Sequence, residues 1–247
     1  MIGLFGATRT VVKSRYALIT PDGHVNSSLP GWENVICIVQ ISPALGAKFC
    51  QYLITLNKDS HGRGNTGANQ YFIYVIEGNC SVLVDAKKHR MEAGHYAYVP
   101  AGKDMHVQSS GSGGKILIFQ KPYEMLAGKG KPETIVAHER EVKGQPFLGN
   151  EDARLQVLLY DDSAFDMAVN IFTYQPGATL PFVETHIMEH GLMMLKGQGV
   201  YRLAEDYHPV QAGDVIWMAP YCPQWFVAMG KTTASYIYYK DVNRDVL

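Results

Sequence analysis

The sequence predicts an all-β protein built from two homologous domains in tandem. Three observations support this fold class: strand-like runs occur along the whole chain, helical periodicity is weak, and landmark residues recur at a constant offset. The chain has 247 residues, of which 47% are hydrophobic and 18% charged. That length and composition allow two medium-sized domains, each with its own core.

The clearest strand signals are runs of five or six residues that are rich in β-branched and aromatic side chains. Gly, Pro or Asn lies near most of their ends, as is typical of strands in sandwiches and barrels. These runs are residues 35–39, 71–76, 115–119 and 235–239. Only the polar stretch 131–143 shows a pattern that favours a helix.

An internal repeat of 119 residues indicates a duplication. In each half, two glycines at turns are separated by 16 residues, and the two pairs are related by the offset of 119: Gly78 with Gly94, and Gly197 with Gly213. The same offset carries Lys121, at the end of a predicted strand, onto Lys240. We therefore expect a first domain at 1–121 and a second at 147–247. Segment 122–146, rich in Lys, Glu, Gly and Pro, is the predicted linker.

The composition of the chain limits the classes of molecule that we expect it to bind. The net charge of −1 gives no reason to expect nucleic acid or a membrane surface. The four cysteines are scattered without a CxxC pair, which is typical of reduced thiols. Residues 1–9 do not resemble a signal peptide, and no apolar run is long enough to cross a bilayer. We expect a cytoplasmic protein that acts on a small molecule.

Four residues of the second domain have the composition of a metal site. Glu184, His186 and His190 follow one another closely, and Gln224 comes 34 residues after His190. We expect Glu184 and His186 to share one face of a strand, since strand residues two apart point the same way. A carboxylate, two imidazoles and an amide suit a divalent transition metal with open coordination positions. We therefore expect a catalytic metal site more than a structural one.

The repeat supplies an internal control for this site. Shifting the four residues back by 119 gives Asn65, Gly67, Tyr71 and Met105, a set unsuited to a divalent ion. The first domain is therefore expected to be metal-free, and the second to be catalytic. In the first domain, the histidines considered for another site are His61, His95 and His106, and no second site is expected there.

Residues 177–197 read G-x6-E-x-H-x3-H-x6-G, which resembles the first motif of the cupin superfamily with carboxylate and imidazole exchanged. The second cupin motif is matched by Gly213, with Gln224 in place of the final His. Cupins are small glycine-punctuated β-barrels that hold one metal inside. The resemblance implies a bicupin: two tandem double-stranded β-helix barrels with a short linker.

The departures from the cupin pattern are similar to those of the (S)-ureidoglycine aminohydrolase family. The segments that carry this likeness are residues 17–23, 184–191, 196–201 and 239–245. The resemblance implies that Mn²⁺ is held by Glu184, His186, His190 and Gln224. It also implies that the substrate contacts Glu184, Gln224, Tyr236 and Lys240, with Glu184 and Lys240 as the catalytic residues.

The implied reaction converts (S)-ureidoglycine and water to (S)-ureidoglycolate and ammonia in purine and allantoin degradation. A six-coordinate ion would leave two adjacent positions for the substrate, which favours Mn²⁺ over tetrahedral Zn²⁺. Two other functions stay open: an Fe(II) oxygenase-type cupin, and a bicupin that binds a small molecule without catalysis. The family resemblance also implies a homo-oligomer, dimeric or larger.

Overall fold

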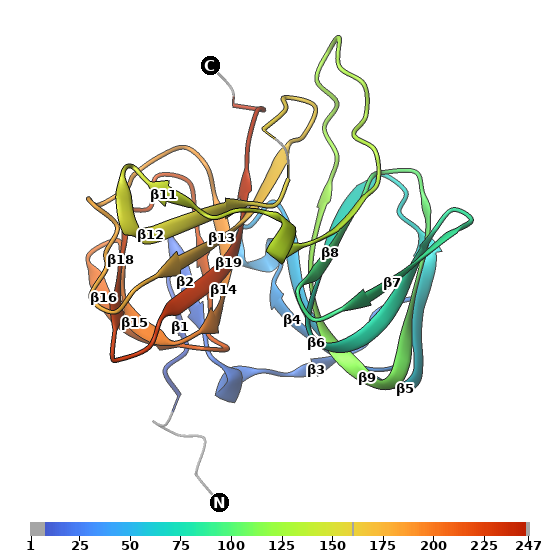
Figure 1. The fold of residues 1–247 in the computed structure, drawn as a ribbon, viewed down its shortest axis with the longest axis horizontal. Helices are drawn as coiled ribbons and strands as arrows, with labels where there is room; N and C mark the ends of the chain where they lie inside the picture. Colours follow the sequence, from blue (N-terminus) through green and yellow to red (C-terminus); the bar gives the residue numbers. More distant parts are fainter. Residues whose placement is uncertain (1–7, 160, 246–247) are drawn as a thin grey trace, which may run out of the picture.

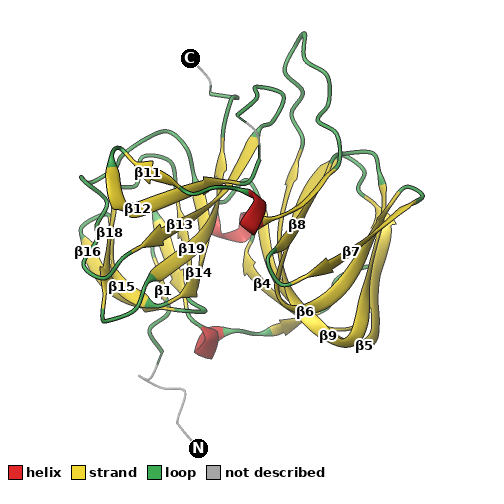
Figure 2. Ribbon diagram, viewed as in Figure 1, coloured by secondary structure: helices red, strands yellow, loops and turns green. Residues whose placement is uncertain are grey.

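The computed structural model describes residues 8–159 and 161–245, and its regular structure is almost entirely β (Figures 1 and 2). The predicted all-β class is confirmed. Three short 3-10 helices, at Pro21–Gly23, Pro43–Leu45 and Glu139–Glu141, are the helical elements of the described residues. None of the helices in this part of the chain has the length and apolar character needed to span a membrane.

The right-hand lobe of Figure 1, which we call the first unit, is one sheet with the order β10-β8-β6-β9-β5-β4-β3, and β7 pairs with β6. Its strands are β3 (Asn26–Ser27), β4 (Trp32–Ile41), β5 (Cys50–Asn65), β6 (Asn69–Val84), β7 (Lys87–Glu92), β8 (His95–Val99), β9 (Asp104–Pro122) and β10 (Ile135–His138).

The left-hand lobe, the second unit, has one sheet with the order β1-β2-β17-β14-β19-β13-β12-β11 and a smaller sheet, β16-β15-β18. Its strands are β1 (Val11–Val12), β2 (Tyr16–Ile19), β11 (Gln145–Phe147), β12 (Asn150–Val157), β13 (Met167–Tyr174), β14 (His190–Lys196), β15 (Gln198–Leu203), β16 (Asp206–Gln211), β17 (Val215–Met218), β18 (Gln224–Met229) and β19 (Ala234–Asp241).

Two segments pair with strands that the predicted boundaries did not anticipate. Strand β2, from the start of the chain, pairs with β17, so residues 11–19 belong to the sheet of the second unit. Strand β10, from the predicted linker, pairs with β8 of the first unit. The helix predicted over 131–143 is therefore wrong, because its β-branched residues Ile135 and Val136 extend a sheet edge instead. The predicted first domain also loses residues 11–19 to the second unit.

Residues 1–7, on which the absence of a signal peptide was partly argued, lie outside the described part.

Strand pairing repeats the 119-residue offset in two places. Tyr71 pairs with Val99, and the residues 119 positions later, His190 and Met218, also pair. Ile54 pairs with Ile116 in the first unit, as Thr173 pairs with Ser235 in the second. The inward faces nevertheless differ on two neighbouring strands, β13 and β19, as β19 illustrates. Ile116 and Ile118 of β9 pack inside the first unit, whereas Tyr236 and Tyr238 of β19 pack inside the second. Since facing alternates along a strand, this one-residue change reverses which side chains point inward.

Three apolar cores account for most of the buried side chains. One lies within each unit, and the third joins the units: Phe49 of the first unit packs against Tyr239 of the second with ring centroids 4.1 Å apart. The buried ion pair between Lys121 and Asp166 also crosses this junction. The two units therefore share one packed interface.

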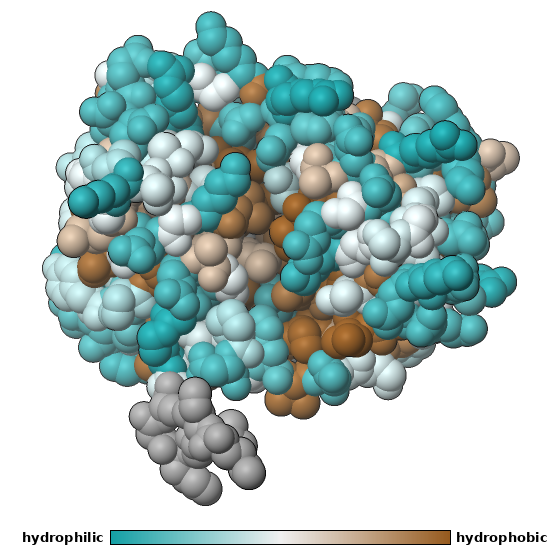
Figure 3. All heavy atoms as spheres, turned by 60° about the horizontal axis from the view of Figure 1, so that its bottom comes forward, coloured by the Kyte–Doolittle hydropathy of each residue, from teal (hydrophilic) through white to brown (hydrophobic). Residues whose placement is uncertain are grey.

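The surface turned toward the viewer in Figure 3 is mostly polar, with apolar patches between the lobes and low on the right-hand lobe. The exposed large apolar side chains of the first unit include Val25, Ile36 and Val39, on or next to β3 and β4. These side chains do not by themselves identify a partner, so the homo-oligomer remains a prediction.

Candidate active site

The four predicted metal ligands are brought together in the second unit. Glu184 and His186 lie in the loop between β13 and β14, His190 is the first residue of β14, and Gln224 is the first residue of β18. The expectation that Glu184 and His186 share a strand is wrong. Glu184 instead forms an isolated bridge with Gln224, whose N–H donates to the Glu184 carbonyl over 2.9 Å while the Glu184 N–H donates back over 2.8 Å. This bridge fixes the loop against β18.

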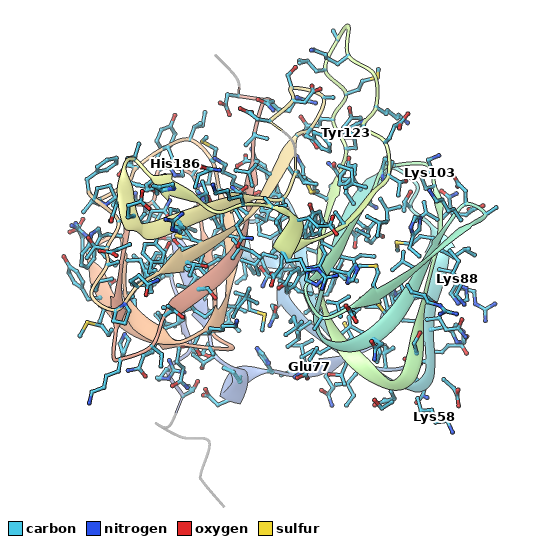
Figure 4. The ribbon with its side chains drawn as sticks, viewed as in Figure 1. Lys58, Glu77, Lys88, Lys103, Tyr123 and His186 are labelled. Carbon is cyan, nitrogen blue, oxygen red and sulfur yellow. The ribbon has the colours of Figure 1, made fainter. Side chains whose placement is uncertain are left out.

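These residues line a cavity of about 160 Å³ inside the second unit. Figure 4 labels His186 in this lobe, close to β11 and β12. The volume is below the roughly 300–1,000 Å³ of sites for drug-sized ligands, so it suits a small metabolite. The lining side chains are Phe147, Leu155, Phe172, Glu184, His186, Met188, His190, Leu192, Tyr201, Gln224, Tyr236, Tyr238 and Lys240.

Direct contacts connect three of the four candidate ligands. The rings of His186 and His190 lie with centroids 4.8 Å apart, and Nε2 of His186 is 3.0 Å from the amide of Gln224. Tyr201 donates its hydroxyl proton to Oε1 of Gln224 over 3.2 Å. Tyr201 therefore orients the amide, a role that the sequence did not reveal because only the strand pairing of β15 with β18 brings them together.

Burial keeps the two imidazoles neutral. It lowers the pKa of His190 well below the usual value, and the neighbouring His186 and Lys240 lower it further. Burial followed by Lys240 also lowers the pKa of His186, against a smaller opposing effect of the Met188 backbone. The Nδ1 atoms of both rings are buried without a hydrogen bond of good geometry. Neutral, under-satisfied ring nitrogens are the form in which histidine binds metals.

The carboxylate of Glu184 experiences two opposing influences. Burial raises the pKa of Glu184, and the Lys240 ammonium partly offsets this. The site thus combines a buried carboxyl group, two neutral imidazoles and the Lys240 side chain.

Lys240 and Lys121 are not structural equivalents, although the repeat predicted that they are. Lys240 pairs with His190 across the sheet and lines the cavity with Tyr236 and Tyr238. Lys121 instead pairs with Gln70, on the opposite face, and binds the buried carboxylate of Asp166. Among the described residues, Lys240 forms no ion pair with a carboxylate. Its ammonium is available to an anion in the cavity.

Two tyrosines of β19 complete the wall beside Lys240. The hydroxyls of Tyr236 and Tyr174 lie 3.0 Å apart, and Asn170 donates to the hydroxyl of Tyr238 over 3.1 Å. Tyr236 was predicted as a substrate contact, whereas Tyr238 was not singled out. The alternation of strand residues would have placed Tyr238 on the same face as Tyr236 and Lys240.

The end of the ligand-bearing loop is fixed from both units. The buried carboxylate of Glu189 accepts hydrogen bonds from the backbone N–H of Lys48 over 3.0 and 3.2 Å, and from the Trp217 indole over 3.3 Å. The N–H of Glu189 donates to Asp241 over 2.6 Å. The first unit therefore helps to hold the segment that leads into His190.

A second group of possible ligands lies in the first unit. One ligand atom from each of Glu92, His95 and His138 lies within 4.8 Å of the other two. Among the described residues, this is the one group of three such side chains that stands out as a possible ion site. Of these three residues, only His95 was considered from the sequence.

The structure and sequence were compared with those of known proteins. No family model matches the chain. The oxalate decarboxylase of Bacillus subtilis superposes with a TM-score of 0.72 over 96% of this chain and 79% of its own, at 11% identity, which is a likeness of fold alone. The E. coli protein Ylba superposes with a TM-score of 0.87 at 33% identity, covering 98% of this chain and 97% of that one. The chain therefore shares the all-β fold of these cupin-like neighbours.

Curated relatives give the family. The (S)-ureidoglycine aminohydrolase of Arabidopsis thaliana is 38% identical over 98% of this chain and 80% of its own length. The enzyme of that name from Escherichia coli strain K12 is 36% identical over 97% of this chain and 94% of its own. The chain belongs to the (S)-ureidoglycine aminohydrolase family.

Proposed function

We propose that this protein is a manganese-dependent (S)-ureidoglycine aminohydrolase, and that its two units are the barrels of a bicupin. Water replaces the α-amino group of ureidoglycine, giving ureidoglycolate and ammonia. The observation that carries the proposal is the cavity in which Lys240, which has no carboxylate ion-pair partner in the described part of the chain, lies with Glu184 and two neutral imidazoles. Family membership at 36–40% identity supports the same activity.

The residues present suit a divalent metal ion. Glu184, His186, His190 and Gln224 offer one anionic and three neutral donors, and burial favours the metal-binding form of both imidazoles. These four residues would hold the ion. When bound, it would supply positive charge and coordination positions for a carboxylate and an amine, the groups that share one carbon in ureidoglycine. Tyr201 would hold the amide of Gln224 in place through the hydrogen bond to its oxygen.

The chain's own side chains then account for binding and proton transfer. The ammonium of Lys240 attracts the carboxylate of the substrate, because no protein carboxylate among the described residues neutralises it. Tyr236 and Tyr238 bring hydroxyls to the same wall and orient the ureido group. The carboxylate of Glu184, which lines the same cavity, takes the proton from the attacking water and passes it to the departing amine. The small cavity limits the amount of water beside the reacting carbon.

The test combines metal analysis with ammonia release from freshly generated ureidoglycine. We expect Mn²⁺ to be retained and ammonia to appear without oxygen consumption. The Glu184→Ala variant should lose both metal and turnover. Oxygen consumption without ammonia would instead favour an Fe(II) oxygenase, and ligand binding without turnover would favour a non-catalytic bicupin. The cytoplasmic location and the homo-oligomer remain predictions of the sequence.

A further inference from the structure

The first unit carries a group of ligands that the proposed reaction does not use. Glu92 ends β7, His95 begins β8, and His138 ends β10, so three elements meet at one point. The ligand atoms lie within 4.8 Å of one another. His95 and His138 are directly paired across the sheet, and their rings are edge to face with centroids 4.5 Å apart.

Gly94 makes room for this arrangement. It has a φ of +87°, and a Cβ at this position would lie 2.6 Å from Cε1 of His138. Its carbonyl accepts the N–H of Glu139 over 2.9 Å, which fixes the segment that follows His138. The glycine that first revealed the repeat therefore also provides the space in which the ring of His138 lies.

The second unit shows that the fold does not require Glu92 and His95 at this turn. Residues 119 positions after Glu92 and His95 are Gln211 and Asp214. The N–H of Gln211 donates to Asp214 over 2.8 Å, just as the N–H of Glu92 faces Nδ1 of His95 over 3.2 Å. The turn thus needs an acceptor, which a carboxylate supplies. Asp214 is neutralised by Arg9, so that site offers no free ligand.

Binding an ion here has a cost that depends on which ring nitrogen of each histidine carries the proton. To bind an ion through Nε2, each ring must carry its proton on Nδ1. For His95 that proton can be donated to the Glu92 carbonyl, 3.2 Å away, but its Nδ1 then no longer accepts the Glu92 N–H. His138 would lose the hydrogen bond that its Nδ1 accepts from the Arg140 N–H over 3.1 Å. Two neutral hydrogen bonds lower an affinity by about a hundredfold at most, which three ligands to one cation outweigh.

Access and burial also suit an ion. His138 is buried, His95 is half-buried and Glu92 is exposed, so the site opens to solvent on the side of the carboxylate. Glu92 and His95 also line a surface hollow of about 490 Å³ beside Lys88, which Figure 4 labels on the outer side of this lobe. A water molecule can fill the remaining coordination position from this hollow.

We propose that Glu92, His95 and His138 bind a first-row divalent cation of the zinc class. Two imidazoles and one carboxylate, with one open position, form a donor set that Zn²⁺ accepts. The ion joins the linker strand β10 to the β7–β8 turn, so it stabilises the docking of the linker on the first unit. This site is separate from the candidate active site, and the inference does not depend on the proposed reaction.

The test measures zinc bound to the full-length protein by elemental analysis after chelation and equilibrium dialysis at low micromolar free Zn²⁺. The variants are Glu92→Gln and His95→Ala, with His89→Ala on the same hairpin as the matched control. We expect wild type and His89→Ala to bind this zinc. Both test variants should bind it at least about tenfold more weakly, since even the loss of a residue that only hydrogen-bonds a metal ligand has an effect of that size. The His190→Ala variant, altered in the other site, should keep it.

Equal zinc binding by Glu92→Gln, His95→Ala and His89→Ala would overturn the proposal. Glu92 is exposed, so the Glu92→Gln variant is expected to fold normally, which circular dichroism checks. As a second measurement, zinc should raise the melting temperature of wild type and of His89→Ala more than that of His95→Ala. A melting shift that is equal in all three proteins would also refute the site.

Discussion

The buried ion pair between the units allows a sharp test of what holds them together. Nζ of Lys121 lies 2.9 Å from Oδ2 of Asp166, and these side chains are 6% and 0% exposed. Asp166 also accepts hydrogen bonds from Gln70 and from the N–H of Glu124. The Lys121→Met variant keeps the aliphatic stem but leaves the carboxylate buried without its cation. Breaking a buried pair in this way costs about 3–5 kcal/mol.

The matched control is Lys103→Met. Lys103 pairs with Asp85 at 2.8 Å, but these side chains are 39% and 53% exposed, and such a surface pair contributes at most about 1 kcal/mol. For a chain of this size, 1 kcal/mol corresponds to roughly 2–4 °C in melting temperature. The Lys121→Met variant should therefore melt several degrees below the Lys103→Met variant. It should also unfold at a lower urea concentration. Equal unfolding midpoints for the two variants would falsify the reasoning.

Three further predictions concern the candidate site. The Lys240→Met variant should show a raised KM and a kcat/KM lowered by about 10- to 100-fold, because it lacks one charged hydrogen bond to the substrate. Its metal content should be unchanged, and a loss of metal would show instead that Lys240 acts on the four metal ligands. Tyr201→Phe should weaken metal retention about tenfold, measured by dialysis against a chelator, because Gln224 loses its orienting hydroxyl; unchanged retention would rule this out. Burial raises the pKa of Glu189 from 4.5 to about 7, so its contribution to stability is complete below pH 4.5 and is lost as the pH rises through 7. In chelator, the unfolding free energy of wild type relative to Glu189→Gln should fall by roughly 3 kcal/mol across that interval; a difference independent of pH would contradict the assignment.

Much of this architecture could be predicted from local sequence patterns. The strand runs at 71–76 and 235–239 lie within β6 and β19, and the repeat is visible in the pairing of the strands. The gathering of Glu184, His186, His190 and Gln224 around one cavity was also predictable from their types and spacing. Local patterns suffice here because turn glycines and β-branched runs mark strand boundaries.

Other features depend on long-range pairing, which residue types do not reveal. The one-residue change of facing in β19 relative to β9 directs Lys240 into the cavity and Lys121 to the unit interface, although both end a strand. The loop position of Glu184 and His186 follows from the bridge to Gln224, since its hydrogen bonds replace those of a continuous strand. His138 joins Glu92 and His95 only because the linker extends the sheet.

The exchange of edge strands affects how this protein could be dissected. Cleavage within residues 123–134 would separate β10 from the sheet that it borders, while β2 would remain on the fragment that carries the first unit. Each fragment would then expose backbone donors and acceptors along an unprotected edge, a template for aggregation. Neither half is a self-contained module, and two halves divided there should be co-expressed rather than studied alone.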